Sequence, residues 1–430
     1  MRDASSTSPK PSSRAPSGRK TGRSAIPERL LAGLWQKRAS RQAWFRTGGG
    51  ARVRVVYPGR AGRSAGPDFR NALLEIEGLG LVQGDVEIHL RQRDWESHGH
   101  GKDPNYNGVV LHAALEVDSP VTTLQSGRQA PVVSLASLLE GEDPRDARPD
   151  HGLWTILDRR GYPRPGTPGE LGDLLDRAGD RRFLMNSAGF QRFLSEQEPD
   201  QTLYEGILEG LGYRHNQQPF LKLAARASYA ALRRAAWRVP GEHRVRALES
   251  WLTRLSGLSG LSGLSTATGG PEPPLPRTGF GVPLSAGEWH CFRVRPSNHP
   301  RRRISGAARL LDRYIEQGLV AGLGRVAGTG SPRELTLALE VGPDPGGKQA
   351  WIGRGRARDL AVNVVLPFLH GLGSRHECLD LYQRFSKLQE NELTREMADQ
   401  LVDPAWGGVV TTARRQQGLL HLHSLLGGAS

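Results

Sequence analysis

Two acidic residues and one histidine near the N-terminus have the types and spacing of a metal-dependent hydrolytic site. Asp68 stands at the start of one predicted strand, and Glu87 and His89 lie two positions apart on the next strand, on the same face. If the two strands pair as a hairpin, Asp68 can approach Glu87. Two converging carboxylates suit Mg²⁺ or Mn²⁺, which prefer oxygen ligands. Such an ion could polarise a phosphodiester and lower the pKa of an attacking water, which His89 could orient or deprotonate.

These three side chains also have ordinary structural interpretations. Asp68 follows a Gly-Pro pair and could cap a turn. Glu87 could face solvent from its strand, and His89 could be a hydrogen-bonded histidine of the surface or core. The metal hypothesis therefore requires that the two carboxylates meet on one face of the sheet.

A polar segment after the second strand carries another group of candidates. Three polar residues and two flanking aromatic residues lie close together: His98, His100, Asp103, Trp95 and Tyr106. The polar residues could bind substrate, assist proton transfer or hold a metal, and the rings could stack on an unpaired base. His-x-His followed by Asp would suit zinc or manganese if a fourth ligand, such as His112 of the next strand, converged. The alternative is a loop whose histidines bond to backbone groups.

Five arginines are concentrated in residues 293–303, including Arg301, Arg302 and Arg303. They could position phosphates of a nucleic acid, because guanidinium groups form paired hydrogen bonds with phosphate. The alternative is the solvated start of a helix near Pro300.

The elements that must position these residues follow a simple order. We expect a helix in residues 27–38, a strand of about seven residues within 52–60, and a turn at 66–67 followed by a strand to about 78. A short strand in 84–90, a short helix or loop in 93–108 and a last strand in 109–118 follow. This αβββαβ module precedes a larger, mostly helical portion, so the fold class is α+β.

The whole chain divides by composition. We expect a disordered basic tail in residues 1–25, the α/β module in 26–140, helices in 150–252, a linker rich in Gly, Ser and Pro in 253–279, and helices again in 280–430.

Composition excludes several classes of protein. The chain has 430 residues but only two cysteines, which excludes a disulfide scaffold and a four-cysteine zinc site. It lacks a long apolar run, an apolar signal core, GxGxxG and the Walker motif, so we expect a cytoplasmic protein with no membrane partner and no nucleotide cofactor. A net charge of +14 makes nucleic acid a plausible partner. The oligomeric state stays open.

The chain resembles the bacterial domain-of-unknown-function 2851 family. The resemblance rests on residues 66–78 and 84–118 (GPDFRNALLEIEG and GDVEIHLRQRDWESHGHGKDPNYNGVVLHAALEVD), and on YEGILEGLGYRHNQQPF, VRPSNHPRRRISGAARLL, IGRGRARDLAVNVVLPFL and ARRQQGLLHLH. This family implies no known activity.

The α/β module is also similar, remotely, to the PD-(D/E)XK nuclease fold. The resemblance implies that Asp68 and Glu87 bind metal and that Glu28 could be an auxiliary acid. His89 stands where that fold usually has a lysine.

These observations predict a metal-dependent phosphodiesterase or nuclease-like protein that acts on nucleic acid. One alternative is a non-catalytic nucleic-acid-binding or assembly protein that retains the fold. Another is a zinc protein that uses the His-x-His segment.

Overall fold

The computed structural model describes residues 28–40, 42, 44–62, 66–139, 152–259, 274–276, 278–292 and 294–426. The chain forms two compact units that meet in sequence between Gly152 and Leu153, called here the sheet unit and the helical unit. The predicted tail 1–25 and residues 260–273 of the predicted linker lie outside the described residues. The prediction of an α+β fold with a larger helical portion is confirmed.

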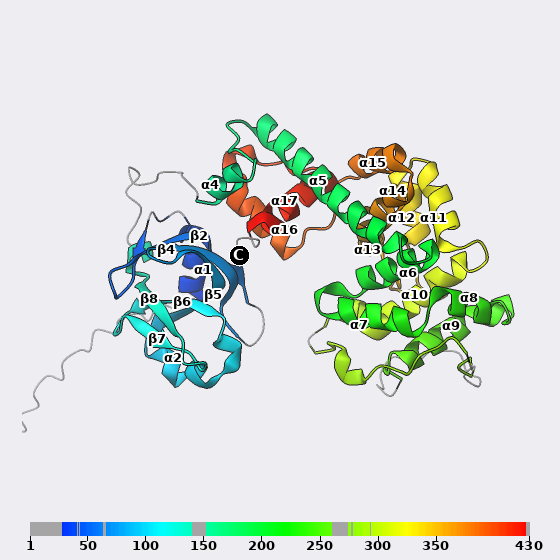
Figure 1. Cartoon of the computed structure of the whole chain (residues 1–430), viewed down its shortest axis with the longest axis horizontal. Coiled ribbons are helices and arrows are strands. Elements are labelled where there is room, and N and C mark those ends of the chain that lie inside the picture. Colours follow the sequence, from blue (N-terminus) through cyan, green and yellow to red (C-terminus); the bar gives the residue numbers. More distant parts are fainter. Residues whose placement is uncertain are drawn as a thin grey trace, which may run out of the picture. The chain divides into compact units, whose positions relative to one another are not determined.

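The sheet unit contains one mixed sheet and short helices, coloured blue to cyan in Figure 1. Its elements are α1 (Glu28–Arg38), β1 (Phe45–Arg46), β2 (Arg52–Tyr57), β3 (Arg60–Ala61), β4 (Phe69–Ile76), β5 (Gly80–Arg91), α2 (Asp94–Ser97), β6 (Val109–Glu116), β7 (Val121–Thr123), β8 (Gln129–Ser134) and α3 (Ala136–Leu139). The strand order is β1-β2-β4-β5-β6-β8-β7, with β3 beside β4. Pairs β5–β6 and β6–β8 are parallel, and the other pairs are antiparallel.

The predicted αβββαβ order corresponds to α1, β2, β4, β5, α2 and β6. The hairpin expected between the second and third strands forms as β4 and β5. Strands β1, β3, β7 and β8 were not predicted. They extend the sheet at both edges.

Alternation along β5 separates a core face from a polar face. Val86 and Ile88 are buried among apolar residues that include Leu31 and Trp35 of α1. Because successive side chains of a strand point to opposite faces, Glu87 and His89 lie on the other face of the sheet. Helix α1 therefore covers the apolar side of the strand that carries the predicted acid.

The register of the β4–β5 hairpin brings the two predicted acids together. Phe69 pairs with Val86, so Asp68 lies next to Glu87 at the end of the ladder. The register shifts just beyond, where Asn71 adopts a positive φ of 55° and its N–H donates to Asp85 Oδ1 at 3.0 Å. Such bulges bend a strand and redirect its side chains.

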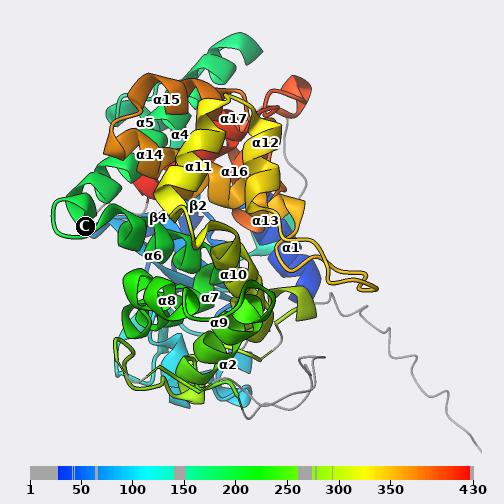
Figure 2. The ribbon, with the colours of Figure 1, turned by 90° about the vertical axis from the view of Figure 1, so that its right-hand side faces the viewer.

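The helical unit is built from fourteen α-helices within the described residues, coloured green to red in Figure 1. They are α4 (Gly152–Arg159), α5 (Pro168–Leu194), α6 (Pro199–Leu211), α7 (Tyr213–Arg226), α8 (Tyr229–Ala236), α9 (Gly241–Leu255), α10 (Pro300–Tyr314), α11 (Leu319–Gly328), α12 (Pro332–Leu339), α13 (Arg354–Leu360), α14 (Leu366–Leu372), α15 (Arg375–Gln383), α16 (Glu392–Leu401) and α17 (Ala413–Leu426). Helix α9 continues to Leu255, inside the range expected to be linker. Helices α11 and α12 lie side by side (Figure 2).

Helices α5 and α17 cross closely because glycines face the contact. A Cβ atom at Gly179 would collide with the carbonyl oxygen of Arg414, and one at Gly418 would collide with that of Leu175. Arg414 pairs with Asp180 across the same contact. Among the helices that the structure describes, none is long and apolar enough to cross a membrane.

Candidate metal centre

Asp68 and Glu87 hold each other in place through the backbone. The N–H of Asp68 donates to Glu87 Oε2 at 2.8 Å, and the N–H of Ile88 donates to Asp68 Oδ2 at 3.1 Å. Glu87 is only 5% exposed, whereas Asp68 is half-buried. The two predicted acids therefore lie at one place on the sheet, each with one oxygen fixed by a backbone donor.

Glu28 adds a third carboxylate at this place. It lies in the first turn of α1, is exposed, and its Oε1 accepts a hydrogen bond from the N–H of Leu90 at 3.4 Å. The helix that covers the apolar face of β5 thus presents an acidic residue at the edge of the site.

Three histidines gather beside Glu87. His89 Nε2 lies 3.2 Å from His98 Nδ1, and His100 Nε2 lies 3.3 Å from Glu87 Oε1. One ring nitrogen from each of His89, His98 and His100 falls within 4.8 Å of the other two. His89 is buried, His100 is partly buried and His98 is exposed. The group is therefore reachable from solvent on the side of His98.

A hydrogen-bond chain fixes the ring of His89 from behind. Its Nδ1 lies 2.9 Å from His112 Nε2, and His112 Nδ1 lies 2.7 Å from Thr122 Oγ1. His112 sits on β6 directly beside Glu87 in the parallel register, and it is fully buried. The side-chain amide of Gln92 donates to Thr122 Oγ1 and to the carbonyl oxygen of Val121. His89, His112 and Thr122 are strand residues, and Gln92 directly follows β5, so the ring is held by the sheet and its edge.

The polar segment after β5 folds back over this face. Helix α2 ends at Ser97, next to His98, and Gly99, at a φ of 78°, turns the chain so that His100 lies on the same side as His98. The ring of His100 stacks on Tyr106 with centroids 4.0 Å apart. Trp95 is buried and its indole N–H donates to the carbonyl oxygen of Thr123 at 3.2 Å. The two predicted aromatic residues pack in the fold, with Trp95 1% and Tyr106 7% exposed.

Burial and like charges raise the pKa values of the two predicted acids and lower those of two histidines of the site. Burial, together with the charge of Asp68, raises the pKa of Glu87 to about 8. Burial also raises the pKa of Asp68. Burial and neighbouring imidazoles lower the pKa of His89 to about 3 and that of His112 to about 4. The raised pKa of Glu87 reflects the lack of a nearby positive charge, and a cation bound beside it would displace its proton and stabilise the carboxylate.

The other residues predicted for the site lie elsewhere or have other partners. Asp103 caps a short 3₁₀ turn by accepting from the N–H of Asn105 at 2.9 Å. Arg302 and Arg303 are in the helical unit at the start of α10. Arg302 donates to the carbonyl oxygens of Gln349 and Ala350, and Arg303, only 5% exposed, donates to that of Trp351. Arg301, next to them, is partly buried on the same helix. Phosphate binding by these arginines stays a prediction.

Sequence reasoning placed His89 with the carboxylates, and His98 and His100 with Asp103. The structure keeps His89 near Glu87 and also brings the three histidines together, with His112 behind them and not among them. The signal that could have shown this is the short separation, nine residues from His89 to His98, because it allows only a brief excursion of the chain between the two rings.

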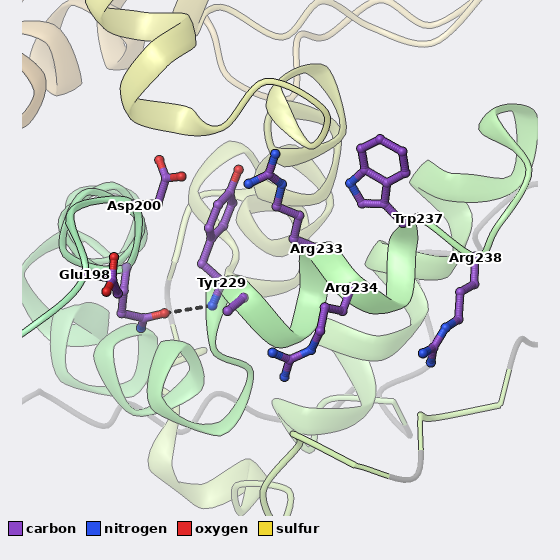
Figure 3. Close-up of a pocket in the computed structure, with 9 residues that line it drawn as sticks. Glu198, Asp200, Tyr229, Arg233, Arg234, Trp237 and Arg238 are labelled. Atoms are coloured by element: carbon purple, nitrogen blue, oxygen red, sulfur yellow. Dashed lines mark hydrogen bonds between the residues drawn. The ribbon is translucent and has the colours of Figure 1, made fainter.

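The helical unit has a cavity of about 610 Å³ at the end of α8 (Figure 3). Arginines and an exposed tryptophan line one side, and the start of α6 lines the other: Arg233, Arg234, Trp237, Arg238, Glu198 and Asp200. The indole of Trp237 is 61% exposed. Arg233 donates to the carbonyl oxygens of Ile315 and Glu316, whereas Arg234 and Arg238 are exposed.

Comparison with known proteins gives one match. Residues 28–146 match the family described as "Protein of unknown function (DUF2851)". That range contains every side chain of the candidate metal centre. No curated protein and no solved structure matches the chain.

Proposed function

We propose that the sheet unit binds a divalent cation, Mg²⁺ or Mn²⁺, through Asp68 and Glu87 and hydrolyses phosphodiester bonds of a nucleic acid. The observation that carries this proposal is the mutual fixation of the two carboxylates by backbone N–H groups across the β4–β5 hairpin. Rigid positioning of this kind is what a catalytic cation site requires.

The donor set fits a hard cation. Oxygen ligands are the ones that Mg²⁺ and Mn²⁺ prefer, and burial with little compensating charge makes a dication a favourable neighbour for Glu87. When bound, the cation would supply Lewis acidity, polarising a phosphoryl oxygen and making a nearby water easier to deprotonate. Glu28, close to both acids, would add negative charge at the same place.

In this proposal His89 does not orient or deprotonate the attacking water, the role expected from its place in the sequence. Both of its ring nitrogens already face other histidines, at 2.9 Å and 3.2 Å. His89 is therefore a positioning residue that keeps the neighbouring rings in place. The lysine usual at this position in the similar nuclease fold has no counterpart here.

Nucleic acid is the partner that the charge of the chain supports. The net charge of +14 favours a polyanion, and the cavity of the helical unit presents Trp237 between exposed arginines. An exposed indole can stack on an unpaired base while guanidinium groups contact phosphates.

The test is a cleavage assay on labelled single- and double-stranded DNA and RNA with Mg²⁺ or Mn²⁺. Wild type should cleave at least one substrate, whereas Glu87→Gln and Asp68→Asn should lose activity by about 100-fold or more, and Glu116→Gln, an exposed acid on β6, should not change it. Activity that persists in both site variants would contradict the proposal.

Two other results would select other functions. Binding that weakens with salt and occurs without cleavage would indicate a nucleic-acid-binding protein that retains the fold. Zinc that stays bound at one equivalent, with neither cleavage nor nucleic-acid binding, would indicate a zinc protein.

A further inference from the structure

The three histidines beside Glu87 form a group that the carboxylate site does not use. We propose that His89, His98 and His100, with Glu87 as the fourth ligand, bind one transition-metal ion, best suited to Zn²⁺. This position shares Glu87 with the Mg²⁺ or Mn²⁺ position but differs from it in its other ligands, and the proposal does not depend on any hydrolytic activity.

Two distances between the donor atoms match the edges of a tetrahedral site. With Zn–N bonds of about 2.0–2.1 Å, neighbouring ligand atoms of a tetrahedron are separated by about 3.3–3.4 Å. His89 Nε2 and His98 Nδ1 are 3.2 Å apart, and His100 Nε2 and Glu87 Oε1 are 3.3 Å apart. The remaining measured edge, from His89 Nε2 to Glu87 Oε1, is 3.8 Å. The other distances among the three histidine nitrogens are within 4.8 Å, so a bound ion would have to draw the rings and Glu87 together to close the shell.

The surroundings supply the orientation that ligating histidines need. A metal on His89 Nε2 requires the proton on Nδ1, which then donates to His112 Nε2. His112 in turn donates from Nδ1 to Thr122 Oγ1. Metal-bound histidines usually have such a partner on the other ring nitrogen, because it fixes the tautomer and the ring plane.

The ligand types select the class of metal. Three imidazole nitrogens and one carboxylate are typical of Zn²⁺ and related transition metals, whereas Mg²⁺ prefers oxygen ligands and keeps several waters. The exposed ring of His98 gives the ion a path of entry.

Glu87 can serve both positions because its oxygens have different neighbours. Oε2 accepts from the N–H of Asp68, and Oε1 faces His100 and His89. A bridging carboxylate of this kind is common where two metal ions act together. Asp68, by contrast, contributes a ligand only to the Mg²⁺ or Mn²⁺ position. This difference allows mutations to affect one metal position without removing a ligand of the other.

The test uses full-length protein stripped of metal by a chelator and titrated with Co²⁺, followed by Zn²⁺ competition. Wild type should bind one equivalent of Co²⁺, show the visible absorption bands of a four-coordinate ion, and release it to Zn²⁺. His98→Ala should abolish these bands. Thr122→Val, which removes the last link behind His89, should weaken binding by about 10-fold.

Two variants serve as controls. Glu116→Gln, which alters an exposed acid of β6, should bind Co²⁺ as wild type does, and so should His243→Ala, which alters an exposed histidine of the helical unit. His98 is exposed, so its replacement should leave folding intact, and circular dichroism verifies this. The proposal is wrong if stripped, folded wild type takes up neither Co²⁺ nor Zn²⁺, or if His98→Ala binds as tightly as wild type.

Discussion

His112 shows how one buried residue can determine the state of several others. It touches no solvent, and each ring nitrogen has one partner, His89 or Thr122. The proton on one ring therefore decides where the proton sits on the next. The positions of the side chains in the site depend on this chain of hydrogen bonds as much as on His98, which faces the solvent.

Replacing His112 should destabilise the protein. His112→Leu removes both hydrogen bonds and leaves His89 Nδ1 and Thr122 Oγ1 with one fewer partner inside the fold, at a cost of about 1–3 kcal/mol. Urea denaturation of metal-free protein would measure it. Thr123→Val, an exposed change on the neighbouring position, should stay within about 0.5 kcal/mol. Equal stabilities of His112→Leu and wild type would show that the chain of rings contributes nothing.

The same buried rings predict a loss of stability in acid. The folded pKa values of His89 and His112, about 3 and about 4, lie below the ordinary value of 6.5. A group whose pKa is lowered by folding stabilises the fold fully above its unfolded pKa, and this contribution is lost as the pH falls from 6.5 toward the folded value. Glu87, whose pKa folding raises to about 8, acts in the opposite direction between about pH 8 and pH 4.5, but the two histidines outweigh it below about pH 6.5. Metal-free wild type should therefore lose stability as the pH falls from about 6.5 to about 5. His112→Leu, with one titrating ring fewer, should show a shallower decrease, and parallel curves would contradict this reasoning.

At the scale of the elements, local pattern determined what could be predicted. Helix α1 and strands β4, β5 and β6 carry clear apolar periodicity, and their residues already implied that Glu87 and His89 share a face. Strands β1 and β3 have two residues each, and β8 contains Pro131, so their pairing depends on the rest of the sheet. The short separation of His89 and His98 is visible in the sequence, but the direction in which α2 returns the chain to β5 depends on tertiary packing such as that of buried Trp95.

Late in the chain, Gln416, Gln417 and Gly418 had no explanation from sequence. In the structure, Gln416 bonds to both backbone groups of Leu388, and Gln417 accepts from Arg182. Gly418 lets α17 approach α5. These residues hold helices together, and their partners are too distant in sequence to be inferred from pattern.

The contact of α5 with α17 should tolerate no added methyl group. Gly179→Ala should cost about 1–3 kcal/mol, because its Cβ would meet the backbone of α17. Gly189→Ala lies on the same helix with no atom within 4 Å and should stabilise the protein by about 0.5–1 kcal/mol. Thermal unfolding of both variants would measure the difference, and similar shifts in Tm would contradict the close crossing.

At the scale of the whole molecule, the two units carry different chemistry. The sheet unit contains the carboxylates and histidines, and the helical unit contains the cavity with Trp237 and the arginines. Binding of nucleic acid and binding of metal should therefore respond to different mutations.

Trp237→Ala should weaken the binding of single-stranded DNA by about 1–3 kcal/mol, the usual contribution of one stacked base. Fluorescence anisotropy with a labelled oligonucleotide would measure this loss. Phe193→Ala, which removes another exposed ring of the helical unit, should bind as wild type does. Co²⁺ uptake should be the same in all three proteins. Unchanged affinity for DNA in Trp237→Ala would exclude the cavity as a base-binding site.

Every proposed metal ligand, and the histidine behind them, comes from one continuous stretch between Glu28 and His112, inside the compact unit that ends at Gly152. A single recombination event could therefore transfer the complete set of ligands to another chain. The cavity of the helical unit would not be transferred with these ligands. A protein produced by such an exchange would keep the metal site, and the domain fused after it would determine which substrate it binds.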